Sequence, residues 1–542
     1  MTGEETRRDV IVIGAGFAGL YLVHQMRKAG FTVRALEAGG GVGGTWYWNR
    51  YPGARCDVQS LEYSFGFDDD LQQEWEWTEK YASQPEILRY LEHVADRFDL
   101  RRDIQFDTRV VAATFDDETT TWTVETEAGE RFVSRYLVAA TGCLSSANVP
   151  DIPGRDDFDG PTYHTGRWPH DGVDFTGQRV AVIGTGSSAV QSIPIIAEQA
   201  AELTVFQRTA TYSVPARNEP LPPELQEEVK RRYPDVRAAN RLTAAGFGAL
   251  STTNAPLRTM AELDEDERQR QLEERWELGG LGFLGTFSDT IITPEANEVA
   301  AEFVRSKIRE IVHDPAVAEL LSPKQVIGCK RLCIDSGYYE TFNRPNVHLV
   351  DISSNGIEAI TATGVRANGV EHEVDAIVFA TGFDAMTGAL AKIRFTGAGG
   401  RTLDEAWAEG PKTYLGLGVP GFPNLFLVTG PGSPSVLTNM VTSIEHHVEW
   451  ITECISYLRD IGEERIEADP QAAEEWVAYV NSIAGFTLFP TCNSWYLGAN
   501  IPGKPRVFMP LPGFAPYAVK CADVAAKGYE GFVTGARDLT RA

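Results

Sequence analysis

Residues 158–209 carry two motifs in succession, FDGPTYHTGRWP (158–169) and RVAVIGTGSSAVQSIPIIAEQAAELTVFQRT (179–209). The second reads as an apolar strand, a glycine turn, a helix and another strand. Gly184, Gly186 and Ala189 fit the dinucleotide-binding pattern G-x-G-x-x-G/A, whose second glycine lets a pyrophosphate approach the backbone. The helix begins at Ser187 and Ser188, and its N-terminus is free to hold that anion. The stretch therefore predicts a Rossmann-like nucleotide-binding unit.

The residues after the second strand indicate which nucleotide is bound. A unit that recognises a ribose 2′-hydroxyl carries Asp or Glu about 20 residues after the glycine turn. Here Arg208, followed by Thr209, takes that place, 24 residues after Gly184. A guanidinium can hold a 2′-phosphate through two hydrogen bonds, whereas a carboxylate would repel it. We therefore expect this unit to bind NADP.

An earlier stretch, DVIVIGAGFAGL (9–20), carries a motif of the opposite type. Gly14, Gly16 and Gly19 follow β-branched residues, and the next strand ends at Glu37, which suits a ribose hydroxyl. Two sites of different polarity imply two dinucleotides, most simply FAD at the first and NADPH at the second. Two ordinary βαβ turns without ligands are the alternative, which the correctly placed acidic and basic endings disfavour.

Composition excludes several classes of partner. The chain has 542 residues, 43% hydrophobic and 23% charged, as in ordinary globular proteins of several domains. Its net charge of −27 argues against nucleic acid and anionic membranes. NADPH is also an anion, so a local basic patch must hold it, and Arg208, Lys330 and Arg331 are the candidates. No apolar run approaches the roughly 20 residues that span a bilayer, and the N-terminus shows no secretory signal.

The cysteines indicate a reducing compartment. Seven of them are scattered along the chain, which predicts free thiols and a cytoplasmic protein. Cys329 and Cys333 are the nearest pair, and they have no His or Cys companions at metal spacing. We therefore expect them to be structural and expect no metal. We also expect a monomer.

A glycine-rich and then aromatic stretch, GGGVGGTWYWNRYPGARCDVQSLEYSF (39–65), follows Glu37. Glycines let the backbone pass close to a ligand, and aromatic side chains offer flat faces to a ring system. An aromatic loop that packs as core is the alternative. Asp57 is expected near the floor of the same site. The FAD-binding candidates of this and later stretches are Thr45, Trp46, Trp48, Asp57, Tyr63, Val110 and Met440.

The domain organisation follows from two similar strands. YLVAATG (136–142) and DAIVFATG (375–382) are taken as the places where the chain leaves the first nucleotide domain and returns to it. We expect an α/β fold with two Rossmann-like domains, the second inserted in the first. The predicted FAD domain comprises 1–141 and 382–542, the NADP domain 142–214 and 323–381, and a helical insert without chemical motifs 215–322.

The first motif identifies a family. Phe158, Gly160, His164, Trp168 and Pro169 satisfy F-x-G-x-x-x-H-x-x-x-W-(P/D) just before a nucleotide motif. The sequence thereby resembles the type I Baeyer–Villiger monooxygenases, such as phenylacetone and cyclohexanone monooxygenases. The N- and S-oxygenating flavin monooxygenases, the alternative, usually end this motif in an aromatic residue followed by Lys or Arg. The resemblance covers nearly the whole chain, including GTWYWNRYPGARCD (44–57), KRLCIDSGYYE (330–340) and GANIPGKPR (498–506).

The resemblance implies an activity and roles for particular residues. In that family NADPH reduces FAD, O₂ gives a peroxyflavin anion, and this anion attacks a small-molecule ketone to give an ester or lactone. Arg331 matches an arginine that lies over the flavin, with Asp57 as its carboxylate partner. Lys330 and Arg208 match a clamp for the 2′-phosphate, and Trp495 matches a tryptophan near the nicotinamide ribose.

The chemistry itself favours a guanidinium, because it stabilises an oxyanion and does not donate its proton at neutral pH. A salt-bridged structural arginine is the alternative for Arg331. His164 either forms hydrogen bonds at a domain junction or transfers a proton. Cys143 near the flavin either packs inertly or alters oxygen reactivity, and Val436 is a candidate for the ketone pocket. A disulfide reductase is disfavoured because Cys56 has no nearby redox partner in the sequence.

Overall fold

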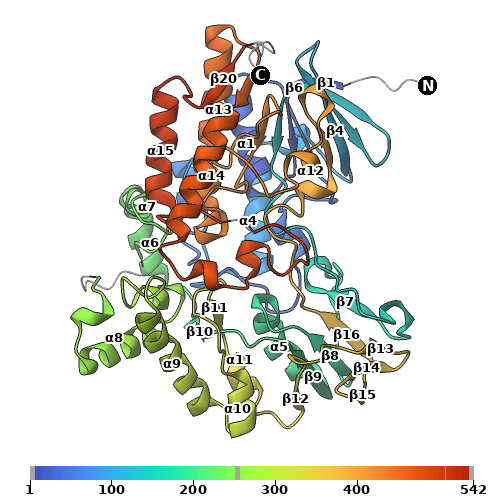
Figure 1. Ribbon diagram of the computed structural model, residues 1–542, viewed down its shortest axis with the longest axis vertical. Helices are drawn as coiled ribbons and strands as arrows, with labels where there is room; N and C mark the ends of the chain where they lie inside the picture. Colours follow the sequence, from blue (N-terminus) through green and yellow to red (C-terminus); the bar gives the residue numbers. More distant parts are fainter. Residues whose placement is uncertain (1–5, 251–256, 507, 536–542) are drawn as a thin grey trace.

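The computed structural model describes residues 6–250, 257–506 and 508–535, arranged around a larger mixed sheet and a smaller parallel sheet (Figure 1). The larger sheet has eight strands in the order β17-β4-β5-β6-β1-β2-β3, with β18 also paired to β6. β1 (Thr6–Ile13) lies between β2 (Val33–Leu36) and β6 (Arg131–Ala139) and is parallel to both. Its second half, VIVI (10–13), is buried, as expected for a central parallel strand. β4 (Val110–Asp116) and β5 (Thr121–Thr126) extend this sheet as antiparallel strands.

The C-terminal part of the chain returns to this larger sheet. β17 (Arg394–Thr396) pairs with β4, and β18 (Leu425–Leu427) pairs with β6. α1 (Phe17–Lys28) packs against α13 (Met440–Ile461), which in turn contacts α15 (Phe514–Ala526). Two strands from the C-terminal part of the chain thus belong to the same sheet as β1. Among the described residues, no helix is long and apolar enough to cross a membrane.

The smaller sheet carries the second glycine motif. Its five strands run in the order β12-β9-β8-β16-β7 and pair in parallel throughout. The apolar residues of the central strand are fully buried, and α5 follows directly after the glycine turn. The elements are β7 (Thr162–His164), β8 (Arg179–Ile183), α5 (Ser187–Gln199), β9 (Glu202–Gln207), β12 (Val347–Asp351) and β16 (Ala376–Phe379).

The two passages of the chain between the sheets lie side by side. The Asn148 amide donates to the Gly382 carbonyl at 2.9 Å, and the Met386 amide donates to the Cys143 carbonyl at 2.8 Å. An antiparallel bridge joins Ala147 to Phe383 between them. The crossings therefore form a short hydrogen-bonded ribbon between the two sheets.

The region expected as one helical insert, 215–322, divides between the two cores. α6 (Pro223–Arg231) and α7 (Tyr233–Arg241) bury Val229, Tyr233 and Val236 in the core of the larger sheet. Three later helices pack on the core of the smaller sheet: α8 (Glu265–Leu278), α9 (Pro294–Ile311) and α10 (Pro315–Leu321). The first two helices of the region thus belong physically to the other half of the molecule (Figure 1).

The described residues form further helices and strands. They are α2 (Thr45–Trp48), α3 (Asp69–Glu74), α4 (Gln84–Arg97), β3 (Ile104–Gln105), β10 (Ser213–Pro215), β11 (Cys333–Asp335), α11 (Tyr338–Thr341), β13 (Ala359–Ile360), β14 (Gly364–Ala367), β15 (Val370–Glu373), α12 (Leu403–Ala406), β19 (Ile466–Ala468), α14 (Pro470–Ala484) and β20 (Phe532–Thr534).

Candidate active site

The first glycine turn is built for a close approach of backbone and ligand. Gly14 has φ +107°, and a Cβ there would lie 2.6 Å from the Ala140 carbonyl oxygen. A Cβ on Gly19 would collide with the Gly14 carbonyl. α1 begins after Gly16 without a side-chain cap, so its first-turn amides lack a side-chain acceptor. Such a helix end fits the pyrophosphate of a dinucleotide.

Glu37 follows β2 and turns its carboxylate back to this turn. Its two oxygens accept hydrogen bonds from the amides of Ala15, at 2.7 Å, and Gly39, at 2.8 Å. Burial raises the pKa of Glu37, and the two amides oppose that rise. The carboxylate is therefore fixed beside the glycine turn, where it suits ribose hydroxyls and excludes a 2′-phosphate.

The aromatic stretch contributes a buried pair. Trp46 is buried in α2, and its indole N–H donates to the Tyr63 hydroxyl at 3.2 Å. Thr45 is exposed, whereas Trp48 is half-buried with its ring edge-on to Tyr47. The other two candidates come from different elements, since Val110 begins β4 and Met440 begins α13.

The second glycine turn has the same form and a more open face. Gly184 has φ +111°, and a Cβ there would lie 2.5 Å from the Ala380 carbonyl oxygen. A Cβ on Gly186 would meet nothing within 4 Å, so space is free above this turn. α5 also begins without a side-chain cap, and Ala189 in its first turn is buried. The first-turn side chains differ: Ser187 is exposed, with Oγ 3.2 Å from Cys333 Sγ, and Ser188 donates to Thr165 Oγ1 at 3.1 Å.

Two cations gather beyond this turn. Arg208 and Thr209 are exposed just after β9, and the Thr209 carbonyl accepts a hydrogen bond from Thr185 at 2.8 Å. Lys330 is half-buried, and its pKa is lowered first by burial and then by the Arg208 charge. Two like charges that disfavour one another suit a shared anion, and a phosphate would relieve their repulsion.

Arg331 and Asp57 form a bidentate ion pair between segments 274 residues apart. Arg331 Nε and Nη2 each donate to one oxygen of Asp57, and Nη1 donates to the Val436 carbonyl at 2.6 Å. The two side chains are 18% and 27% exposed. Burial alone would lower the pKa of Arg331, but Asp57 raises it above its usual range. Arg331 therefore keeps its positive charge in a position that is largely shielded from solvent.

Cys143 and Tyr496 are buried near Arg331, whose charge affects the pKa of each. Burial raises the pKa of Cys143, so this thiol stays protonated at neutral pH, which favours inert packing. Tyr496 is also buried; burial raises its pKa, and the neighbouring Arg331 opposes that rise. The sequence interpretation did not single out Tyr496, although it directly follows Trp495, which lies edge-on to it at 4.5 Å between ring centroids. One apolar cluster of buried residues includes Cys143, Cys329, Ala385, Met386, Val436, Phe489, Cys492, Tyr496, Leu497 and Met509.

His164 lies at the ribbon between the two sheets. Its Nδ1 accepts from the Gly166 amide at 2.9 Å, which leaves the proton on Nε2. Nε2 faces the Asn148 carbonyl at 3.3 Å and the Thr381 hydroxyl at 3.4 Å, one on each crossing. These contacts favour the hydrogen-bonding role over proton transfer.

The rest of the family motif is packing. A Cβ on Gly160 would lie 2.6 Å from both the Phe158 ring and the Asp375 carbonyl. Trp168 is buried against Phe175. The motif therefore joins β7 to the crossings rather than forming a reaction centre.

We expect His164 to stay neutral well below neutral pH. Burial lowers its pKa from 6.5 to about 4. Between these values the unfolded chain binds the proton and the folded chain does not, so this residue makes the free energy of unfolding fall as the pH drops through that window. Titration of the ring by NMR, with His164→Asn to assign the signal, measures the pKa. A ring that is charged at pH 7 would contradict the expectation.

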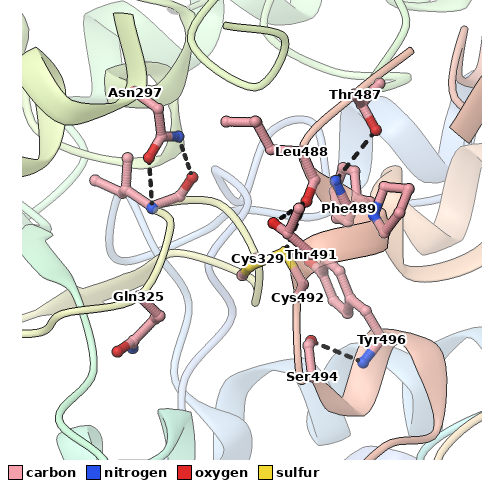
Figure 2. Close-up of a disulfide and its surroundings, with 12 residues drawn as sticks. Asn297, Gln325, Cys329, Thr487, Leu488, Phe489, Thr491, Cys492, Ser494 and Tyr496 are labelled. Carbon is pink, nitrogen blue, oxygen red and sulfur yellow. Dashed lines mark hydrogen bonds between the residues drawn. A yellow bond between two sulfur atoms is a disulfide. The ribbon is translucent and has the colours of Figure 1, made fainter. Parts of the chain in front are cut away.

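Two cysteines are paired, and the prediction of free thiols is wrong for them. Cys329 and Cys492 form a disulfide with Cα atoms 5.5 Å apart (Figure 2). The five other cysteines, Cys56, Cys143, Cys333, Cys454 and Cys521, are free and buried. The pair is 163 residues apart in sequence, so only the packing of the C-terminal loop beside the residues before Lys330 reveals it.

Comparisons with known proteins agree with this geometry. The model of the pyridine nucleotide-disulphide oxidoreductase family matches residues 11–245. The chain is 43% identical to a phenazine N-monooxygenase of Lysobacter antibioticus, over 98% of this chain and 97% of that protein. It is equally identical, at 43%, to a Baeyer–Villiger monooxygenase of Pseudooceanicola batsensis, over 98% and 96%.

Solved structures match over the same length. Oxidized steroid monooxygenase bound to NADP is 54% identical, with a TM-score of 0.93 over 98% of this chain and 99% of that one. The closed crystal structure of cyclohexanone monooxygenase is 44% identical, with a TM-score of 0.95 over 98% and 100%. A structure titled OTEMO complex with FAD and NADP is 40% identical, with a TM-score of 0.94 over 98% and 100%.

Proposed function

Because this chain belongs to the Baeyer–Villiger family of flavin monooxygenases, we propose that it oxygenates an apolar ketone to an ester or lactone beside Arg331. The observation that carries this proposal is the half-buried Arg331–Asp57 pair, which holds a permanent positive charge beside the buried Cys143 and Tyr496. A structure of a relative contains both FAD and NADP, and the two glycine turns described above fit these two nucleotides.

The first turn would hold FAD through the amides after Gly16 and through Glu37. The second turn would hold NADPH through the amides after Gly186, with Arg208 and Lys330 at the 2′-phosphate. Bound together, the two supply hydride and activate O₂ for insertion beside a carbonyl. We propose that Trp46 and Tyr63 border the flavin site and that Trp495 borders the nicotinamide end.

Arg331 would act on negative charge at the ketone. When an oxygen atom adds to a carbonyl carbon, the carbonyl oxygen gains negative charge, and a fixed cation in a dry place stabilises it strongly. A guanidinium at this raised pKa does not donate its proton at neutral pH. Asp57 would act as a positioning residue, because its two hydrogen bonds fix the orientation of the Arg331 guanidinium.

The test is oxygenation of a panel of linear, cyclic, aryl and steroid ketones by the FAD-loaded protein, with NADPH consumption measured and the products identified. Esters or lactones in amounts that match the NADPH consumed support the proposal. NADPH consumption that yields only hydrogen peroxide with every ketone would contradict it. The steroid ketone belongs in the panel because the 54% identical relative is a steroid monooxygenase.

Oxygenation of nitrogen is the second candidate, and one observation favours it. A relative of 43% identity over nearly the whole chain is a phenazine N-monooxygenase. An aromatic N-heterocycle and a sulfide should therefore be assayed beside the ketones. N-oxide formation at a higher kcat/KM than ester formation would make this second function the main one.

Arg208→Ala is expected to lower kcat/KM for NADPH by about 10- to 100-fold, because a charge-assisted hydrogen bond contributes about 1.5–3 kcal/mol. The kcat/KM for NADH should hardly change, since NADH lacks the 2′-phosphate. Steady-state kinetics with both nucleotides checks this. Arg344→Ala, on the loop before β12, is the matched control. An equal loss with NADH would show that Arg208 does not recognise the phosphate.

We propose that the FAD domain comprises 1–141 and 382–542 and the NADP domain 142–214 and 323–381, with α6 and α7 of the insert docked on the former. We propose a monomer, which light scattering on the purified protein tests. We propose a cytoplasmic location, supported by five free cysteines.

A further inference from the structure

The Cys329–Cys492 disulfide joins two segments that each carry proposed site residues (Figure 2). Cys329 directly precedes Lys330 and Arg331. Cys492 lies three residues before Trp495, in the long loop between α14 and α15. The bond therefore lies at the proposed nucleotide site itself.

The segment on the Cys329 side is firmly fixed. Asn297 of α9 donates to the Thr290 and Ile327 carbonyls at 2.8 and 2.9 Å, and its side-chain oxygen accepts from the Ile327 amide at 3.1 Å. Gln325 donates to the Ala210 carbonyl at 2.7 Å. Figure 2 shows the Asn297 side chain hydrogen-bonded to the backbone just before the disulfide. Arg331 therefore follows directly on a segment that several hydrogen bonds hold in place.

The loop on the Cys492 side is held by hydrogen bonds to three other segments, by an ion pair between Lys504 and Asp384, and by buried side chains such as Tyr496. Residues 485–506 follow α14, and this described stretch of the loop contains only two single-turn 3₁₀ helices. The Leu488 amide donates to the Ile291 carbonyl at 2.9 Å, Asn500 donates to the Phe383 carbonyl at 2.9 Å, and Lys504 donates to the Ala385 carbonyl at 2.6 Å. A connection of this length is typical of lids that order over a site.

We propose that Cys329 and Cys492 form a thiol–disulfide switch that staples the 485–506 loop over the Arg331 segment when oxidised and releases it when reduced. On oxidation each thiol loses a proton and an electron, and one sulfur–sulfur bond forms. The two electrons reduce a low-molecular-weight disulfide, such as glutathione disulfide, to two thiols. Both cysteines are buried, at 5% and 2% exposure, so exchange takes place when the loop lifts.

The staple would govern how nucleotides enter and leave. If the proposed function is right, Lys330 lies on one stapled segment and Trp495 on the other, so NADP⁺ bound between them leaves only when the segments part. Oxidised protein should then release NADP⁺ several-fold more slowly than reduced protein. Bound NADP⁺ should in turn slow reduction of the bond by dithiothreitol, because the two effects are linked.

The test uses the full-length, FAD-loaded protein, equilibrated in glutathione disulfide or in dithiothreitol. After alkylation and digestion without reductant, mass spectrometry should find a cross-linked Cys329–Cys492 peptide only in the first sample. A short chymotrypsin pulse on folded protein should cut after Phe486, which is 75% exposed, several-fold faster in the second sample. Stopped-flow release of NADP⁺ then measures the functional effect.

Cys329→Ala and Cys492→Ala should each behave like reduced wild-type protein in both buffers. Cys454→Ala, which alters a free cysteine within α13, should keep the full response. The proposal is overturned if the two cysteines stay thiols in glutathione disulfide, or if cleavage and NADP⁺ release are the same in both redox states. Loss of NADP⁺ binding in both states would instead count against the proposed function, and the cleavage rates would still decide the switch.

Discussion

Arg331→Ala is expected to lower ketone oxygenation by about 10²–10³, the usual effect of removing one preorganised charge or donor at an oxyanion. The variant should still bind FAD, and NADPH should still reduce it, because Glu37, Arg208 and both glycine turns are untouched. NADPH consumption would then continue without ester, and the oxygen would leave as hydrogen peroxide. Reduction without product formation is the pattern that separates a role in oxygen transfer from a role in binding.

Stopped-flow flavin reduction and product analysis measure the two halves of this reaction separately. Arg331→Lys is the informative companion, since a lysine keeps a charge but loses the planar pair of donors and its pKa falls on burial. We expect it to recover part of the activity at most. Arg309→Ala, on the exposed side of α9, controls for the loss of an arginine in general. Ester formation at the wild-type rate in Arg331→Ala would remove this residue from the mechanism.

The nucleotide-binding halves were predictable because their determinants are local. Each glycine turn needs a positive φ at its first glycine and a close neighbour strand, and sequence alone shows the glycines. The similarity of YLVAATG (136–142) and DAIVFATG (375–382) has a structural reason. Ala140 and Ala380 occupy equivalent positions in the two segments. The Ala140 carbonyl lies against Gly14, and the Ala380 carbonyl lies against Gly184. The repeated segment therefore marked which strand lies beside each turn, and with it the return of the chain.

The features that were missed depend on contacts between distant segments. Cys329 and Cys492 carry no local sign of pairing, and α6 and α7 follow the second nucleotide motif in sequence while packing on the first core. The sequence carries no local signal for Tyr496, because this residue interacts with Arg331, which lies 165 residues earlier in the chain. Spacing rules describe one element and its neighbours, whereas these contacts are set by how two halves close on each other.

Asp57→Ala is expected to lower oxygenation by about 10- to 100-fold and to lower the melting temperature. Removing one partner of a buried pair leaves the other charge uncompensated, which costs about 3–5 kcal/mol where burial is complete. The loss of stability should be smaller here, because the Asp57 and Arg331 side chains are 27% and 18% exposed to solvent. Asp57→Asn should retain a hydrogen bond to Arg331 and lose less activity. Thermal unfolding and product formation are measured on the same preparations.

The double variant Asp57→Ala/Arg331→Ala decides how the carboxylate acts. If Asp57 serves only to aim and compensate Arg331, its removal should cost no further oxygenation once the guanidinium is gone, so the double variant should match Arg331→Ala in rate. It should also be more stable than either single variant, since no unpaired charge is left buried. Multiplying losses would mean that Asp57 touches the reaction by itself, and its description as a positioning residue would then be wrong.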